Sequence, residues 1–209
     1  TLGSICSDHV ILSFIVSWVT NLAAQLQVGT MFSGIVETQS VITKAKPRAG
    51  VVEIHIKRPS TFDDLATGES ICVDGVCLTI ESFDADHMVF ALAAETLQVT
   101  GWSWEDLPSK SINLERSLAL GARIHGHLVT GHVEGLGEVL ECGHQGEMAL
   151  LRMAFPPELT PFFWRKGSVA INGAAETAAA PNDGDSLAAA IRCLLRKDSA
   201  ELAESQVQL

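Results

Sequence analysis

The stretch HLVTGHVEG, from His127 to Gly135, is similar to MFSGIVETQ, from Met31 to Gln39, about a hundred residues earlier. Both run from an apolar residue through Ser or Thr to Gly, and after one further residue to Val and Glu. Two more blocks recur in the same order: EIHIKRP ending at Pro59 matches LLRMAFP ending at Pro156, and SICVDG ending at Gly75 matches SVAING ending at Gly173. The chain therefore contains one unit at least partly twice.

The segment SICVDGVCLTIESF, Ser70 to Phe83, predicts a β-hairpin. Apolar residues alternate on both sides of Asp74-Gly75, and this dipeptide readily takes the positive φ angles of a two-residue turn. Met88 to Leu92 predicts another strand, and SINLER, from Ser111, predicts the last strand of the first unit. Such short strands, with little helical periodicity between the blocks, favour a small closed antiparallel barrel.

Composition limits the classes of partner. The chain has 209 residues, of which 47% are hydrophobic and 19% charged, as is typical of globular proteins. Its net charge of -11 argues against nucleic acid as a partner and favours a small molecule or a protein.

Five cysteines without a CxxC pair predict free thiols and a reducing, cytoplasmic location. A zinc site at Cys72 and Cys77 is a weaker alternative, because no second Cys/His pair has ligand spacing.

The two ends of the chain lack the pattern of the repeated unit. Residues 1–30 are interpreted as an extension before a domain that begins at Met31. The apolar run Val10 to Val19 is too short to span a bilayer and has no basic residue before it, so a membrane partner is not favoured, although a surface anchor stays an alternative. After Gly173 no β pattern is visible, and Ser186 to Ser205 predicts an Ala- and Leu-rich helix.

Five motifs together resemble one enzyme family. They are MFSGIVE from Met31, GVCLTI from Gly75, AAET from Ala93, INLERSL from Ile112 and GHLVTGHVEG from Gly126. Jointly they are similar to riboflavin synthase, which is built of two similar β-barrels. The resemblance implies an all-β fold of tandem six-stranded antiparallel Greek-key barrels.

The resemblance also divides the chain. It implies an N-terminal lumazine-binding barrel over 31–122 and a partial C-terminal lumazine-binding barrel over 123–177, between the extension over 1–30 and a divergent, helical tail over 178–209. Ala174, Ala175 and Glu176 stand where the second copy of GVCLTI would continue. We therefore expect the second barrel to be incomplete.

The family's activity is a dismutation without a cofactor. Two molecules of 6,7-dimethyl-8-ribityllumazine give riboflavin and 5-amino-6-ribitylamino-pyrimidinedione, with one substrate on each of two barrels from neighbouring subunits of a homotrimer. Holding two reactants in register can lower a barrier by roughly 7 to 11 kcal/mol. One alternative is a non-catalytic lumazine- or flavin-binding protein that retains only the N-terminal site. Another is an inert variant that associates through exposed strand edges.

By the same resemblance His132 and Cys77 are the candidate catalytic residues. A neutral imidazole can exchange a proton near pH 7, whereas Cys77 is equally consistent with a small apolar strand residue. A metal site at His125, His127 and His132 is not favoured, because no carboxylate or cysteine motif joins them. Lys166 is expected either to bind a ribityl hydroxyl or to be solvated. The implied substrate-binding residues are Phe32, Gly34, Ile35, Val36, Cys77, Leu78, Thr79, Ala91, Leu92, Ala93, Ala94, Glu95, Thr96, Gly131, His132, Val133, Lys166 and Thr177.

Overall fold

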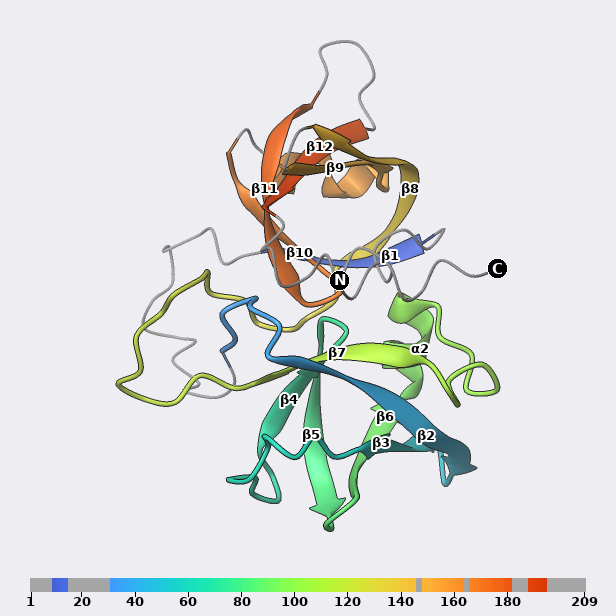
Figure 1. Ribbon diagram of the computed structural model, residues 1–209. Helices are drawn as coiled ribbons and strands as arrows, with labels where there is room; N and C mark the ends of the chain where they lie inside the picture. The colour runs from blue at the N-terminus through green and yellow to red at the C-terminus, as the bar shows by residue number, and fades with distance from the viewer. Residues whose placement is uncertain (1–8, 15–30, 146–147, 164–165, 182–187, 195–209) are drawn as a thin grey trace, which may run out of the picture.

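The computed structural model describes residues 9–14, 31–145, 148–163, 166–181 and 188–194, and these residues form two closed six-stranded barrels (Figure 1). The first barrel has the strand order β2-β3-β6-β5-β4-β7. Its strands are β2 (Thr38–Arg48), β3 (Val51–Lys57), β4 (Ser70–Val73), β5 (Val76–Phe83), β6 (His87–Ala93) and β7 (Ser111–Arg116). All neighbouring strands are antiparallel, so the predicted all-β barrel architecture is confirmed.

The predicted hairpin is β4 and β5. Cys72 lies opposite Cys77, and the turn residues Asp74 and Gly75 have φ angles of 49° and 90°. Both angles lie in the left-handed region, which Asp and Gly tolerate better than most residues. Along β5 the side chains alternate between the barrel core and the outside, and Ile80 is buried in that core.

One short helix in the first barrel was not expected from the sequence. The helix α2 (Ala94–Thr100) follows β6 directly and ends at Gly101, whose φ is 65°. A left-handed glycine is a common end for a helix. Seven residues are too few to show a clear helical period, so no pattern in the sequence predicts this helix.

The second barrel repeats this topology with the order β1-β10-β11-β12-β9-β8. Its strands are β8 (Gly135–Gln145), β9 (Met148–Ala154), β10 (Ser168–Ile171), β11 (Ala174–Pro181), β12 (Ala188–Leu194) and β1 (His9–Phe14), and the 3-10 helix η1 (Pro157–Phe162) precedes β10. In this repeated order β1 takes the place that β7 has in the first barrel. Asn172 and Gly173 form the equivalent hairpin turn, with φ angles of 47° and 85°.

The expectation of an incomplete second barrel is therefore wrong. The missing strand comes from the segment interpreted as an extension, because β1 pairs with both β8 and β10. Ile11 donates its N–H to Asn172 Oδ1 at 2.9 Å and accepts the Asn172 N–H at 3.1 Å, and the Leu12 side chain is fully buried. The helix predicted over Ser186 to Ser205 is also wrong where the structure describes it, because β12 pairs with β9 and β11. The rest of that segment, and residues 15–19 of the apolar run, lie outside the described residues.

The two barrels meet through reciprocal contacts. Gly34 O accepts the Ala175 N–H at 2.8 Å, and Gly131 O accepts the Cys77 N–H at 2.9 Å. Between these bonds Phe32 pairs with Val129 in an isolated β-bridge. The repeated blocks of the sequence therefore face each other across the contact between the barrels.

The cysteines differ from one another. Cys72 and Cys77 are free thiols, whereas Cys142 takes part in a disulfide. The prediction that all five are free is therefore wrong for Cys142, because chain spacing says little about which cysteines a closed barrel brings together.

Within the described residues no helix is long and apolar enough to cross a membrane.

Candidate functional site

The predicted site residues on β5 follow the alternation of the strand. Leu78 points into the barrel core, whereas Thr79 is exposed and Cys77 is half-buried. Ile80, which is also in the core, lies opposite Phe90 of β6. Since strand neighbours point to alternate faces, the side chains of Cys77 and Thr79 share the outer face of the sheet.

The end of β6 and the start of α2 add small residues to this face. Ala91 is half-buried, while Ala93 and Ala94 are exposed. Leu92 is fully buried in the barrel core, so neither Leu92 nor Leu78 could offer a ligand on the outer face more than backbone groups. Along α2, Glu95 is exposed and Thr96 is half-buried. The expected face thus combines alanines with hydroxyl groups.

The loop before β2 supplies the other predicted residues of the first barrel. Phe32 is fully buried between the barrels, whereas Ile35 is exposed and Val36 is half-buried. Gly34 has a φ of 72°, and a Cβ built there would lie 2.3 Å from Ala175 Cβ. Only glycine meets both requirements at this position.

Glu115 holds this loop in place, although sequence reasoning missed it. Its buried carboxylate on β7 accepts hydrogen bonds from Ser33 N at 2.5 Å, Ser33 Oγ at 2.7 Å and Gly34 N at 3.0 Å. Burial raises the pKa of Glu115, and the hydrogen bonds from Ser33 and Gly34 oppose this shift. A charged residue on a strand reads from sequence as solvent-facing, so no pattern singled it out.

The two candidate catalytic residues lie on adjacent segments. Gly131 has a φ of 74°, and a Cβ there would lie 2.7 Å from Cys77 Cβ. His132 follows Gly131, is exposed, and donates its N–H to Thr130 Oγ1 at 3.3 Å. Val133 packs against the core of the first barrel. The structure thus places His132 next to the glycine that contacts Cys77.

Two predicted residues lie elsewhere in the second barrel. Lys166 is exposed before β10, with a φ of 65°. Thr177 lies on β11 opposite Ser168, and its side chain is outside those described. No group of three or more His, Cys, Asp or Glu side chains that could hold a metal ion occurs within the described part of the chain.

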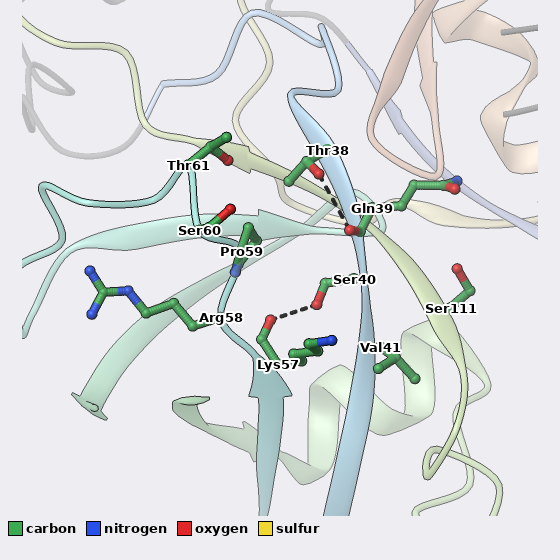
Figure 2. Close-up of a pocket in the computed structure, with 10 residues that line it drawn as sticks. All are labelled: Thr38, Gln39, Ser40, Val41, Lys57, Arg58, Pro59, Ser60, Thr61 and Ser111. Carbon is green, nitrogen blue, oxygen red and sulfur yellow. Dashed lines mark hydrogen bonds between the residues drawn. The ribbon is translucent and has the colours of Figure 1, made fainter. Parts of the chain in front are cut away.

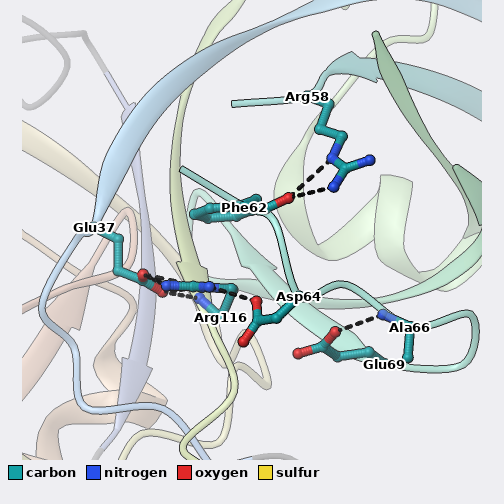
Figure 3. Close-up of polar contacts among 7 residues, drawn as sticks. All are labelled: Glu37, Arg58, Phe62, Asp64, Ala66, Glu69 and Arg116. Carbon is teal, nitrogen blue, oxygen red and sulfur yellow. Dashed lines mark hydrogen bonds and ion pairs between the residues drawn. The ribbon is translucent and has the colours of Figure 1, made fainter. Parts of the chain in front are cut away.

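A cavity of about 450 Å³ lies beside Ile35 and is also lined by Ser33 and Glu115. Arg116 lies in its wall, bonded to Glu37 at 2.6 Å and to Asp64 at 2.6 Å (Figure 3). These carboxylates raise the pKa of the guanidinium. The arginine is thereby fixed as part of the wall of the cavity.

A second cavity, of about 680 Å³, opens where β2 leaves β3 to pair with β7 (Figure 2). Ser40 Oγ donates to Lys57 O at 2.5 Å across this opening. It is lined by Thr38, Gln39, Ser40, Val41, Lys57, Arg58, Pro59, Ser60, Thr61 and Ser111. None of these residues was among those predicted to bind the substrate.

The repeated architecture has a counterpart among known families. Residues 33–117 and 130–197 both match the sequence profile of the lumazine binding domain. The chain belongs to the lumazine-binding domain family. The second match of this lumazine-binding domain protein extends past Gly173, after which no β pattern is visible in the sequence, and it leaves out β1.

Curated relatives of this lumazine-binding domain protein are riboflavin synthases. It is 33% identical to the enzyme of Actinobacillus pleuropneumoniae over 154 residues, which cover 73% of this chain and 71% of that one. It is 32% identical to the enzyme of Bacillus subtilis (strain 168) over 148 residues, which cover 70% and 68% of the two chains. The family assignment predicted from the motifs is confirmed.

Solved structures support the fold of this lumazine-binding domain protein. The crystal structure of LumP complexed with riboflavin superposes with a TM-score of 0.67, covering 81% of this chain and 89% of that one at 20% identity. A LumP complex with 6,7-dimethyl-8-(1'-D-ribityl) lumazine has a TM-score of 0.64 at 21% identity. These structures show the fold, whereas the domain match and the curated relatives make the chain a riboflavin synthase or a lumazine-binding protein by family.

Proposed function

We propose that this chain is a riboflavin synthase that joins two molecules of 6,7-dimethyl-8-ribityllumazine without a cofactor. The observation that carries the proposal is a duplicated binding unit, made of a glycine loop and a later strand. Along the chain the Gly34 loop precedes the strand that holds Cys77, and the Gly131 loop precedes the strand that holds Ala175. Two copies of one binding unit suit a reaction between two identical molecules. The curated riboflavin synthases that match most of the chain support the same reaction.

The outer face of the first barrel suits a flat heterocycle. The side chains of Ala91, Ala93 and Ala94 are small, so they leave room for a ligand above this face. The hydroxyl of Thr79 lies on the same face. The exposed Ile35 offers an apolar contact at the edge. A planar ring would lie on this face, and its ribityl chain would bond to hydroxyl groups around it.

The proposed chemistry depends on orientation and on proton transfer. One lumazine gives a four-carbon unit to the other, so the acceptor becomes riboflavin and the donor becomes 5-amino-6-ribitylamino-pyrimidinedione. His132 would exchange the proton of the reacting methyl group, because histidine is the side chain that most often serves as a proton-transfer group. Cys77 would contact the ring from β5. The second substrate would come from a neighbouring subunit of a homotrimer, which size-exclusion chromatography with light scattering would detect.

Turnover of added lumazine is the test of this proposal. Riboflavin should accumulate as the lumazine is consumed, with two lumazines lost for each riboflavin formed. His132→Gln should lower kcat by about 100-fold or more, the usual contribution of a positioned proton-transfer group. His87→Gln is the matched control, since His87 starts β6 at the far end from Ala93, and it should leave kcat unchanged. No riboflavin from the folded wild-type chain would refute the proposal.

The second candidate is a non-catalytic lumazine-binding protein. It is favoured by the difference between the halves, because Ala175 stands where the first barrel has Cys77. Stoichiometric binding of lumazine by the folded chain, with quenching or a shift of its fluorescence but no riboflavin formed at any protein concentration, would select this function.

A further inference from the structure

The last strand of each barrel occupies an equivalent place. Leu114 O of β7 accepts the Glu37 N–H at 2.9 Å, and Leu12 O of β1 accepts the Glu134 N–H at 2.8 Å. The two glutamates are the final residues of the similar stretches SGIVE and TGHVE. Leu12 and Leu114 are therefore counterparts, and so are the residues that follow them.

Those following residues, Glu115 and Ser13, differ in what they hold. The Glu115 carboxylate accepts three hydrogen bonds from Ser33 and Gly34. Ser13 is also buried, but its Oγ is the single buried side-chain oxygen or nitrogen without a hydrogen-bond partner within the described residues. A serine side chain is two bonds shorter than a glutamate side chain and carries no charge. The first loop thus has a charged acceptor that its counterpart in the second half lacks.

The contrast is local, because other contacts of the two loops are conserved between the halves. Ile35 N–H donates to Ser33 Oγ at 3.2 Å, and His132 N–H donates to Thr130 Oγ1 at 3.3 Å. Both loop glycines have a left-handed φ. Among the residues that the structure describes, the anchor that Glu115 gives the first loop has no counterpart in the second half.

We infer that Glu115 positions the Ser33–Gly34–Ile35 loop for the ligand, and that Ser13 at the equivalent place makes the two halves unequal in affinity. A loop that is ordered before binding loses less conformational freedom when the ligand arrives. The inference rests on the proposed function, since the ligand is the lumazine of that proposal. Glu115 is a positioning residue, because its oxygen atoms bond to the loop from the β7 side. The chain should therefore bind one lumazine tightly, at the first barrel, and a second more weakly.

Fluorescence titration with 6,7-dimethyl-8-ribityllumazine tests the inequality. Glu115→Gln keeps the shape but turns one acceptor into a donor that faces an N–H, so the tight dissociation constant should rise at least about tenfold. Ser13→Ala is the matched control and should leave that constant within about twofold, because the hydroxyl it removes has no partner. Ser33→Ala, which removes one donor of three, should give an intermediate rise. Equal effects of Glu115→Gln and Ser13→Ala would overturn the inference.

Hydrogen exchange of the ligand-free chain provides a readout that does not need the proposed function. The Gly34 amide should exchange more slowly than the Gly131 amide, and Glu115→Gln should accelerate Gly34 while the core amide of Ile54 stays protected. Should lumazine fail to bind although this difference is seen, the proposed function falls and the positioning role of Glu115 stands. Equal exchange at both glycines in the wild-type chain would overturn the inference itself.

Discussion

Leu12→Ala tests whether the N-terminal strand belongs to the second barrel. The Leu12 side chain is fully buried, and its backbone lies between Gly135 of β8 and Ile171 of β10. Truncating a leucine at such a site removes apolar contacts and leaves a cavity, which costs about 2 to 5 kcal/mol. For a chain of this size that loss lowers the melting temperature by roughly 4 to 20 °C. Urea denaturation followed by circular dichroism, together with a thermal melt, measures both quantities.

Two control variants give that result its meaning. Leu114→Ala truncates the fully buried counterpart on β7 and should cost a similar amount. Leu140→Ala truncates a leucine of β8 that is 43% exposed, and it should change stability by no more than about 0.5 kcal/mol. If Leu12→Ala costs as little as Leu140→Ala, then residues 9–14 do not close the barrel, and the reasoning that makes β1 the counterpart of β7 is refuted.

Three further predictions concern single side chains of the first barrel. Gly34→Ala should destabilise the fold by at least about 1 to 2 kcal/mol in urea denaturation, because φ is 72° and the new Cβ would clash across the contact between the barrels; an unchanged midpoint would contradict this. Hydrogen bonding by Lys46 is the main cause that lowers the pKa of Glu53 to about 2, so this carboxylate stabilises the fold above pH 4.5, and the stabilisation is lost as the pH falls towards 2. Glu53→Gln should therefore lower the urea midpoint at pH 7 and lower it less at pH 3, and a deficit that grew on acidification would reverse the sign. Iodoacetamide should label the half-buried Cys77 and spare Cys72, since burial raises the pKa of the Cys72 thiol; mass spectrometry of peptides would show the opposite order if the burial were wrong.

The prediction of the fold rested mainly on the duplicated blocks and on the Asp-Gly hairpin. Both depend on local rules: period-two alternation and the positive φ of a two-residue turn. In the structure the same alternation leaves Thr79 exposed and Ile80 in the core. These features are fixed by neighbouring residues, and sequence reasoning recovers them well.

The N-terminal strand could not be found in this way. HVILSF shares just its leucine with its counterpart SINLER on β7, because Ile11 stands at the place of Asn113 and Ser13 at the place of Glu115. Its pairing with β8 and β10 depends on residues more than a hundred positions away, which no local pattern contains.

The alanine-rich segment near the end of the chain was wrongly predicted to be a helix for a different reason. Alanine has the highest intrinsic helix propensity, so AAAIRCL from Ala188 to Leu194 reads as helical. In the barrel this segment lies between β9 and β11, and strand pairing on both sides outweighs the local preference.

Glu115 was missed because the groups that donate hydrogen bonds to its carboxylate come from a loop 82 positions earlier.

The place of β1 also sets an order of events during synthesis. Ile11 emerges from the ribosome first, yet Asn172, to which it bonds, is made 161 residues later. At about 5 to 20 residues per second, the nascent apolar strand waits roughly 10 to 30 s for its partner. The first barrel can close during that delay, whereas the second must wait until β10, β11 and β12 have been made. A chaperone that masks HVILSF would therefore matter more to this protein than the small size of either barrel suggests.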